Sequence, residues 1–286
     1  MWRRLSWVGR VSGILLALFV FMALFAPWIA GDSKNPEDWL PLIKFGPESA
    51  DIFTSPFLAA PDSAHLFGTD YIGRDVFARV VHATKNSLLF SVAVMIASVI
   101  IGTLVGAVMG FFAGRLDMIL SRIIEVISNF PIFLLQLTFL AIFGSNYFIL
   151  FFVMIFSNWI SYARYTRAEF FRLRNLEFVQ AARVLGSSRS RIIFRHLLPN
   201  SLTPILVLIP FDLASTIIGL GGLSFLGFGE PIHVASFGEL LNQAREHFQR
   251  AWWLAVFPGG ALFLLTLSLA LFGAAVRDML DPRLGK

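Results

Sequence analysis

The chain has 286 residues, of which 57% are hydrophobic and only 14% are charged, and its mean hydropathy is +0.74. Because soluble domains carry about 25% charged residues, this composition argues against a soluble globular protein. In a bilayer the same length fits about six helical spans with loops, since each span needs ~20 residues. The chain has no cysteine, and none of its five histidines has another at metal-ligand spacing, so we expect no metal site. A net charge of +5 is a weak argument for nucleic acid, and we expect none as a partner.

Long uncharged stretches predict an all-α membrane protein. The first stretch follows three arginines and exceeds the ~7–15 apolar residues of a signal peptide core, so we interpret it as an uncleaved signal anchor. A turn signal at 144–146 separates the third helix from the fourth. The expected spans are 11–31, 87–113, 118–143, 147–163, 201–226 and 252–276.

The charges of the loops predict the orientation. Loop 164–199 has eight arginines against two glutamates, whereas segment 32–85 has five basic residues against eight acidic ones. Because short cytoplasmic loops are enriched in Lys and Arg, we expect both termini and loop 164–199 in the cytoplasm. Trp28, Trp252 and Trp253 are then expected as anchors at the outer interface, and Trp159 at the inner one.

Four glycines of the second span recur at intervals of four residues. This spacing predicts one helix face that lets another backbone approach closely. The residues concerned are Gly102, Gly106, Gly110 and Gly114.

Loop 164–199 contains the most informative segment. A short helix is expected over Glu177 to Leu185, ended by Gly186 in the left-handed conformation. A second helical stretch, 189–198, is expected to end before Pro199. The small residues Ala181 and Ala182 give the first helix a smooth surface that can enter a groove in another protein. The residues alone leave open a second interpretation, a polybasic segment held by anionic lipid.

The run Gln180-Ala181-Ala182, then Gly186, then Leu198-Pro199 resembles the "E-A-A, three residues, G, nine residues, I-x-L-P" loop of ABC importer permeases. The resemblance implies that this loop is the coupling helix, which sits in a cleft of the ATP-hydrolysing subunit. The coupling residues would be Gln180, Ala181, Ala182, Arg183 and Gly186. Glutamine stands at 180 where the family usually has glutamate, which removes a charge and keeps a hydrogen-bonding side chain.

Three further blocks resemble the C-type permease subunit of dipeptide and oligopeptide importers. They are "G-T-D-x-x-G-R-D-V" at 68–76, "L-S-F-L-G-x-G" at 223–229 and "R-D-x-L-D-P-R" at 277–283. The resemblance implies the type I (MetI-like) permease fold with six transmembrane helices. It divides the chain into 1–86, the tail, first span and periplasmic segment with an elbow helix, and 87–286, the transmembrane domain with its coupling loop. At Leu220 the family often has glutamate.

The residues of the block at 68–76 also indicate a local structure, independently of the resemblance. Thr69, Asp70 and Asp75 are candidate helix N-caps. Val76, Val80 and Ala83 fall on one face of the helix that follows, which enters the second span. We interpret the segment as an interfacial elbow on the outer side.

Asp212, after Pro210, is an acid at membrane depth. Such acids usually face a bundle interior or water. The sequence leaves two roles open: a translocation-path residue that meets the charged end of a peptide, or pairing with Asn158 or Gln136. Asn158 is open to the same two readings, path lining or interhelical hydrogen bonding.

By the same resemblance, the chain is a non-catalytic subunit in the cytoplasmic (inner) membrane. Its expected partners are a B-type permease, two ATP-binding subunits that hold ATP and Mg, an extracellular or periplasmic peptide-binding protein, and lipid. The chain itself has no G-x-x-x-x-G-K-[ST] loop for a nucleotide, so we expect no cofactor and no catalytic residue.

Other functions compete with this one. An importer of nickel chelate, glutathione or opines would share the same blocks. A secondary transporter or channel would predict repeat symmetry, which the sequence does not display. An intramembrane enzyme is disfavoured, because G-x-S-x-G is absent and Asp212 is the one acid clearly at membrane depth.

Overall fold

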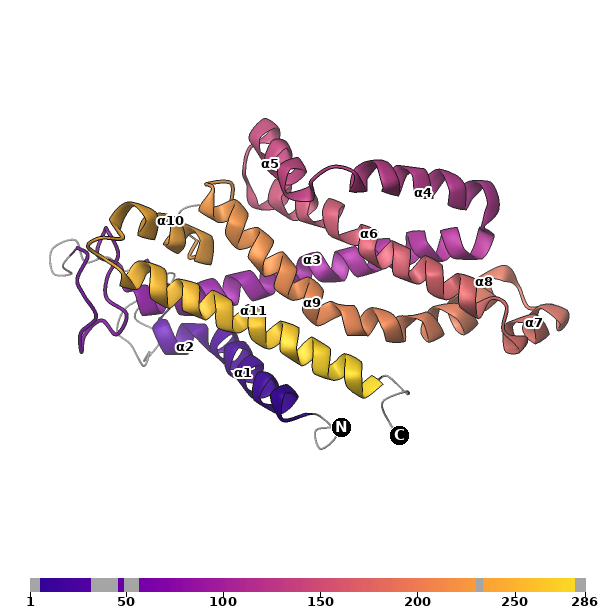
Figure 1. The fold of residues 1–286 in the computed structure, drawn as a ribbon, viewed down its shortest axis with the longest axis horizontal. Coiled ribbons are helices and arrows are strands. Elements are labelled where there is room, and N and C mark those ends of the chain that lie inside the picture. Colours follow the sequence, from indigo (N-terminus) through magenta and orange to yellow (C-terminus); the bar gives the residue numbers. More distant parts are fainter. Residues whose placement is uncertain (1–5, 32–45, 49–56, 230–233, 281–286) are drawn as a thin grey trace. The chain divides into compact units, whose positions relative to one another are not determined.

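The computed structural model describes residues 6–31, 46–48, 57–229 and 234–280, and most of the residues in these ranges are helical (Figure 1). The only extended pairing among them is an isolated bridge between Thr69 and Asp75. The helices are α1 (Trp7–Leu24), α2 (Ala26–Ala30), α3 (Val76–Phe112), α4 (Gly114–Ser128), α5 (Ile132–Phe143), α6 (Tyr147–Leu173), α7 (Glu177–Val184), α8 (Arg189–Arg191), the π-helical η2 (Ile192–Leu197), α9 (Leu198–Phe225), α10 (Phe237–His247) and α11 (Trp253–Leu280).

Among the described residues, 5 helices are long and apolar enough to cross a membrane, and the bent pair α4 and α5 raises the number to up to 6. The prediction of one straight helix over 118–143 is wrong, because α4 and α5 meet at 81°. The break lies just before Pro131. A proline lacks the N–H that a helix needs, and it pushes the residue before it out of the helical region.

Two other helices exceed the predicted spans because hydropathy marks the apolar part of a helix and not its ends. The helix α3 begins at Val76 and continues without a break, so the expected elbow is not a separate helix. Asp75 caps its start by accepting the Ala78 N–H at 2.8 Å, as predicted. The helix α6 continues through charged residues to Leu173. The short helix α10 was not predicted, since its apolar stripe is only three turns long.

The described residues form two compact units, each assembled from separate stretches of the chain. The first comprises parts of 1–92, 140–150 and 213–286, and the second comprises 93–139 and 151–212. The helices α3 and α9 each contribute residues to both units.

In the first unit, α1 packs along α11, and α10 also packs on α11 (Figure 1). Their shared core contains Val76, Val80 and Ala83, the three positions predicted to occupy one helix face. Trp253 is also part of this core, with 4% of its surface exposed, and its Nε1 donates to the Thr69 carbonyl at 3.0 Å. The prediction that Trp253 is an interface anchor is therefore wrong, whereas its neighbour Trp252 is half exposed.

In the second unit, three of the four predicted glycines form a close contact between α3 and α6. A Cβ at Gly102 would overlap the Trp159 carbonyl, and one at Gly106 would overlap the Ala163 carbonyl. A Cβ at Gly110 would lie 2.8 Å from the Arg167 carbonyl.

Gly114 does not belong to this face, so that part of the prediction is wrong. The helix α3 ends at Phe112, and Ala113 and Gly114 both have positive φ, 52° and 62°. This left-handed turn takes the chain away from the helix axis, and a Cβ at Gly114 would meet nothing within 4 Å.

Candidate functional site

The helix α7 carries the residues that the sequence singled out for partner contact. Glu177 lies in its first turn and Arg183 in its last turn, the arrangement that the helix dipole favours. Gly186 has φ 75° and ends the helix. Its N–H bonds to the Arg183 carbonyl at 3.0 Å, and the Ser187 N–H bonds to the Ala182 carbonyl at 3.0 Å. This pair of bonds is a Schellman motif, so the predicted left-handed stop at Gly186 is confirmed.

One side of α7 is held by its own unit. Val179 is buried in a cluster with Ala107, Phe170 and Ile192, and Ala182 is buried as well. The prediction that Ala181 and Ala182 form one exposed surface is therefore wrong. Successive residues of a helix point about 100° apart, so Ala182 packs inward while Ala181 stays exposed.

The opposite side of α7 is open and more apolar than expected. Val184 and Leu185 are 88% and 84% exposed, the highest values among the large apolar side chains that the structure describes. We name this exposed surface the α7 tip; it consists of Gln180, Ala181, Arg183, Val184 and Leu185. The sequence did not lead us to predict this exposed apolar pair. A helix that buries residues 179 and 182 on one face directs residues 184 and 185 away from that face, and this spacing is the signal that could have found them.

Gln180 has a contact that a glutamate could not make. Its Nε2 donates to the Asn175 carbonyl at 3.1 Å. A carboxylate is acceptor-only, so the glutamine closes the turn before α7 by a bond that needs an amide.

Two arginines, Arg167 and Arg174, connect the helices of the unit that carries α7. The Arg174 guanidinium donates to the Gly110 carbonyl at 3.2 Å and lies 4.4 Å from the Phe171 ring centre. The Arg167 guanidinium lies 4.9 Å from the same ring centre and pairs with Asp117 through two hydrogen bonds. These contacts tie α3, α4 and α6 together at the end of the unit that carries α7.

The stretch after α7 differs from its prediction. It does not end before Pro199, because η2 continues into α9. The Leu198 N–H reaches the Ile193 carbonyl, five residues back. The carbonyl of His196, which stands where the permease motif usually has isoleucine, accepts a bond from the Asn200 side chain at 2.6 Å. The wider π turn directly before Pro199 accommodates a proline that has no N–H of its own.

The acid at membrane depth has a defined partner. Tyr162 of α6 donates its hydroxyl to Asp212 at 2.9 Å. Gln136, one of the partners predicted for Asp212, donates to Ser157 at 3.0 Å. Asn158 is half-buried, one helical turn before Tyr162. Tyr162 was missed as a partner of Asp212, and its spacing of four residues from Asn158 on one face of α6 is the signal that could have found it.

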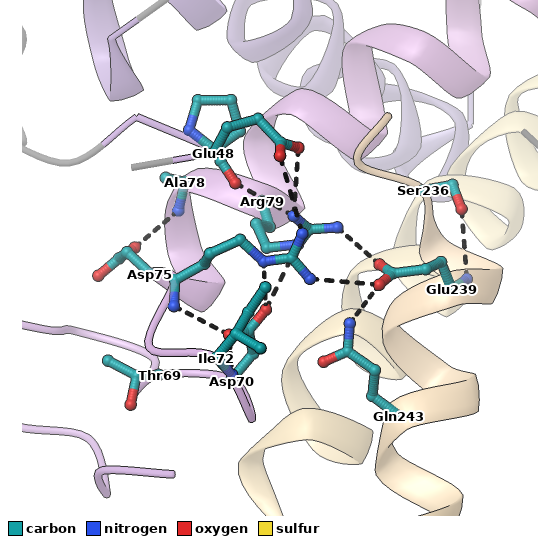
Figure 2. A network of polar contacts seen from close by, with 12 residues as sticks. Glu48, Thr69, Asp70, Ile72, Asp75, Ala78, Arg79, Ser236, Glu239 and Gln243 are labelled. Atoms are coloured by element: carbon teal, nitrogen blue, oxygen red, sulfur yellow. Dashed lines mark hydrogen bonds and ion pairs between the residues drawn. The ribbon is translucent and has the colours of Figure 1, made fainter. Parts of the chain in front are cut away.

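A second polar cluster lies in the first unit, where the sequence showed only capping residues. Arg74 and Arg79 are buried and face Asp70, Glu48 and Glu239 (Figure 2). The Arg74 Nε–Asp70 distance is 2.7 Å, and the Arg79 Nη2–Glu239 distance is 2.7 Å. Glu239 comes from α10, so these pairs fasten the start of α3 to α10.

Leu220 occupies the position at which C-type permeases often have glutamate, so that position is apolar in this chain. Leu220 is fully buried within α9. It therefore contributes to packing, and the chain has no charge there.

Comparison with known proteins places the chain in a family. Residues 102–286 match the model of the binding-protein-dependent transport system inner membrane component. The inner membrane ABC transporter permease protein YejE of Escherichia coli is 38% identical over 90% of this chain and 75% of its own length. The dipeptide transport system permease protein DppC of Alkalihalophilus pseudofirmus is 32% identical over 96% of this chain and 85% of its own.

The oligopeptide transport system permease protein OppC of Haemophilus influenzae is 33% identical over 95% of this chain and 83% of its own. Together with the apolar helices, these matches identify a multi-pass inner membrane protein. The chain belongs to the family of binding-protein-dependent transport system inner membrane components.

Proposed function

We propose that this chain is the permease subunit of an ATP-driven importer that moves dipeptides or oligopeptides across the cytoplasmic membrane. Its family membership and the printed names of its dipeptide and oligopeptide relatives support this cargo. The observation that carries the proposal is the α7 tip, an exposed apolar surface on a short helix whose other side is buried in its own unit.

The α7 tip docks on the ATP-hydrolysing subunit. Val184 and Leu185 would bury apolar surface there, and burial of such surface stabilises an interface by about 25 cal/mol per Å². Lipid is the second candidate partner. It is less suited to this surface, because lipid-binding segments present several basic residues together and the tip has one, Arg183.

The remaining assembly follows from this role. A B-type permease pairs with this chain, two ATP-binding subunits hold ATP and Mg, and a binding protein outside delivers the peptide. The chain has no enzymatic step of its own. Both termini and segment 164–199 lie in the cytoplasm, as the arginine-rich sequence of that segment favours.

Asp212 and Asn158 are the candidate path residues. Both lie on apolar helices where polar groups are costly and usually serve an interior or a water-filled route. Nickel chelate, glutathione and opines are the alternative cargoes, and competition of each with a labelled peptide for uptake separates them.

The test is ATP-dependent uptake of a labelled tripeptide into vesicles that contain the complete transporter. Leu185→Asp should lower uptake about tenfold or more, because charge replaces an apolar contact at an interface. The control is Leu66→Asp, at a leucine of the outer segment that is also exposed. Gly186→Pro should abolish uptake while the protein still inserts, because proline cannot adopt positive φ.

The lipid alternative is separated by measuring how the purified ATP-binding subunit associates with the same vesicles. Docking predicts that Leu185→Asp weakens this association. Unchanged association and unchanged uptake would contradict the docking role.

A further inference from the structure

A pocket of the first unit has no role in the function proposed above. It has a volume of about 380 Å³ and lies at the end of α9 beside α10. Small-ligand sites generally have volumes of about 300–1,000 Å³. The described residues of its lining are Tyr71, Ser224, Gly227, Gly229, Glu239, Asn242, Gln243, Glu246 and His247.

Two polar atoms of this lining are buried and have no hydrogen-bond partner in the described part of the chain. They are Ser224 Oγ and Gln243 Oε1, and each residue is only 6% exposed. The Gln243 amide nitrogen is already bonded to Glu239, so the carbonyl oxygen is the free end of the amide (Figure 2). A buried acceptor without a partner is unfavourable, and a ligand that donates an N–H relieves that cost.

The charges around the pocket select the sign of the ligand. Glu239 is neutralised by Arg79 at 2.7 Å and Arg74 at 3.4 Å. Glu246 is exposed and forms no ion pair with any residue that the structure describes. Among the lining residues that the structure describes, the uncompensated charge is therefore negative, next to neutral oxygen acceptors.

The remaining titratable groups of the lining form an aromatic wall. The Tyr71 and His247 rings stack with their centres 6.0 Å apart and their planes 24° apart. Such a wall suits an apolar or aromatic side chain next to the cationic group.

We propose that this pocket binds the protonated amino terminus of a short peptide. Its ammonium has three N–H donors, which match Gln243 Oε1, Ser224 Oγ and the Glu246 carboxylate. The side chain of the first peptide residue lies against Tyr71 and His247. The identification of the ammonium as a peptide terminus rests on the proposed function. The consequence is selection at the permease itself against peptides whose amino end is blocked.

The experiment uses the assembled transporter in lipid nanodiscs, without the delivery protein and without ATP. Calorimetric titration compares the dipeptide Ala-Phe with N-acetyl-Ala-Phe. We expect the free dipeptide to bind about tenfold more tightly, because acetylation removes the charge and two donors. Glu246→Gln and Ser224→Ala should each weaken binding of the free dipeptide and reduce its advantage over the acetylated one. The matched control, Glu125→Gln, changes an exposed carboxylate of α4 and should leave binding unchanged.

Equal affinity for the two peptides, or undiminished binding by Glu246→Gln, would overturn the inference. Equally tight binding of Nα-acetyl-lysine methylamide would assign the pocket to ammonium groups in general and overturn its assignment to a peptide terminus. These results are independent of ATP-driven uptake. A transporter that imports peptides but shows none of this binding refutes the pocket alone. One that binds the dipeptide but imports no peptide refutes the proposed function alone.

Discussion

Three glycines of α3 allow α6 to approach closely, because each has a hydrogen where any other residue has a Cβ. At Gly106 an added Cβ would overlap the backbone carbonyl of Ala163, which cannot rotate away as a side chain can. The spacing of four residues predicted this contact correctly at Gly102, Gly106 and Gly110. It failed at Gly114 because the positive φ of Ala113 and Gly114 ends the helix first, and no periodicity of side chains reports that turn.

Gly106→Ala should destabilise the second unit by about 1–3 kcal/mol, the usual cost of overpacking a close contact. The measurement is the thermal unfolding midpoint of the purified protein in detergent. Gly260→Ala is the control, since a Cβ there meets nothing within 4 Å in α11. Equal midpoints for the two variants would refute the close-contact interpretation of the α3 glycines.

At the scale of the element, α7 combines a buried side with an open tip. The sequence predicted its bounds and its stop, because Gly186 and a run of helix formers are local signals. It did not predict that Ala182 would be buried, nor that the core partners of Val179 on the same side would come from α3, α6 and η2. Ala107 of α3 is distant in the sequence, and local pattern does not show how α6 and η2, which flank α7 in the chain, fold against it.

Gly186→Ala should destabilise the C-terminal turn of α7 by about 1–2 kcal/mol, because an L-residue with a Cβ is strained at positive φ. Gly186→Asn should cost less, since asparagine tolerates this region. Hydrogen exchange of the amides of residues 185–187 measures the difference. Exchange that is equally fast in both variants would show that the Schellman bonds do not depend on the residue at 186.

At the scale of the whole molecule, contacts between distant segments hold the first unit together. The pair of Arg79 and Glu239 joins residues 160 positions apart. The motif at 68–76 predicted helix caps and an interfacial elbow, and Asp75 does cap α3, but nothing in it pointed to α10. Ion pairs between remote elements follow from the topology, which a single sequence does not specify.

Glu239→Gln should destabilise the first unit by about 3–5 kcal/mol, since it removes a partner from the buried Arg79. The control Glu125→Gln removes an exposed pair with Arg122 and should cost about 0–1 kcal/mol. Chemical denaturation in mixed micelles measures both. A loss no larger than that of the control would mean that other acceptors replace Glu239.

The glycine contact between α3 and α6 has a mechanical consequence. Where two main chains touch directly, there are no long flexible side chains between them to compress or to change rotamer, so the joint is stiff. The buried side of α7, opposite its tip, is seated on these same two helices through Val179. A force on the α7 tip then displaces whole helices and is not absorbed by local side-chain movement. This rigidity is the mechanical property that a transmission element needs.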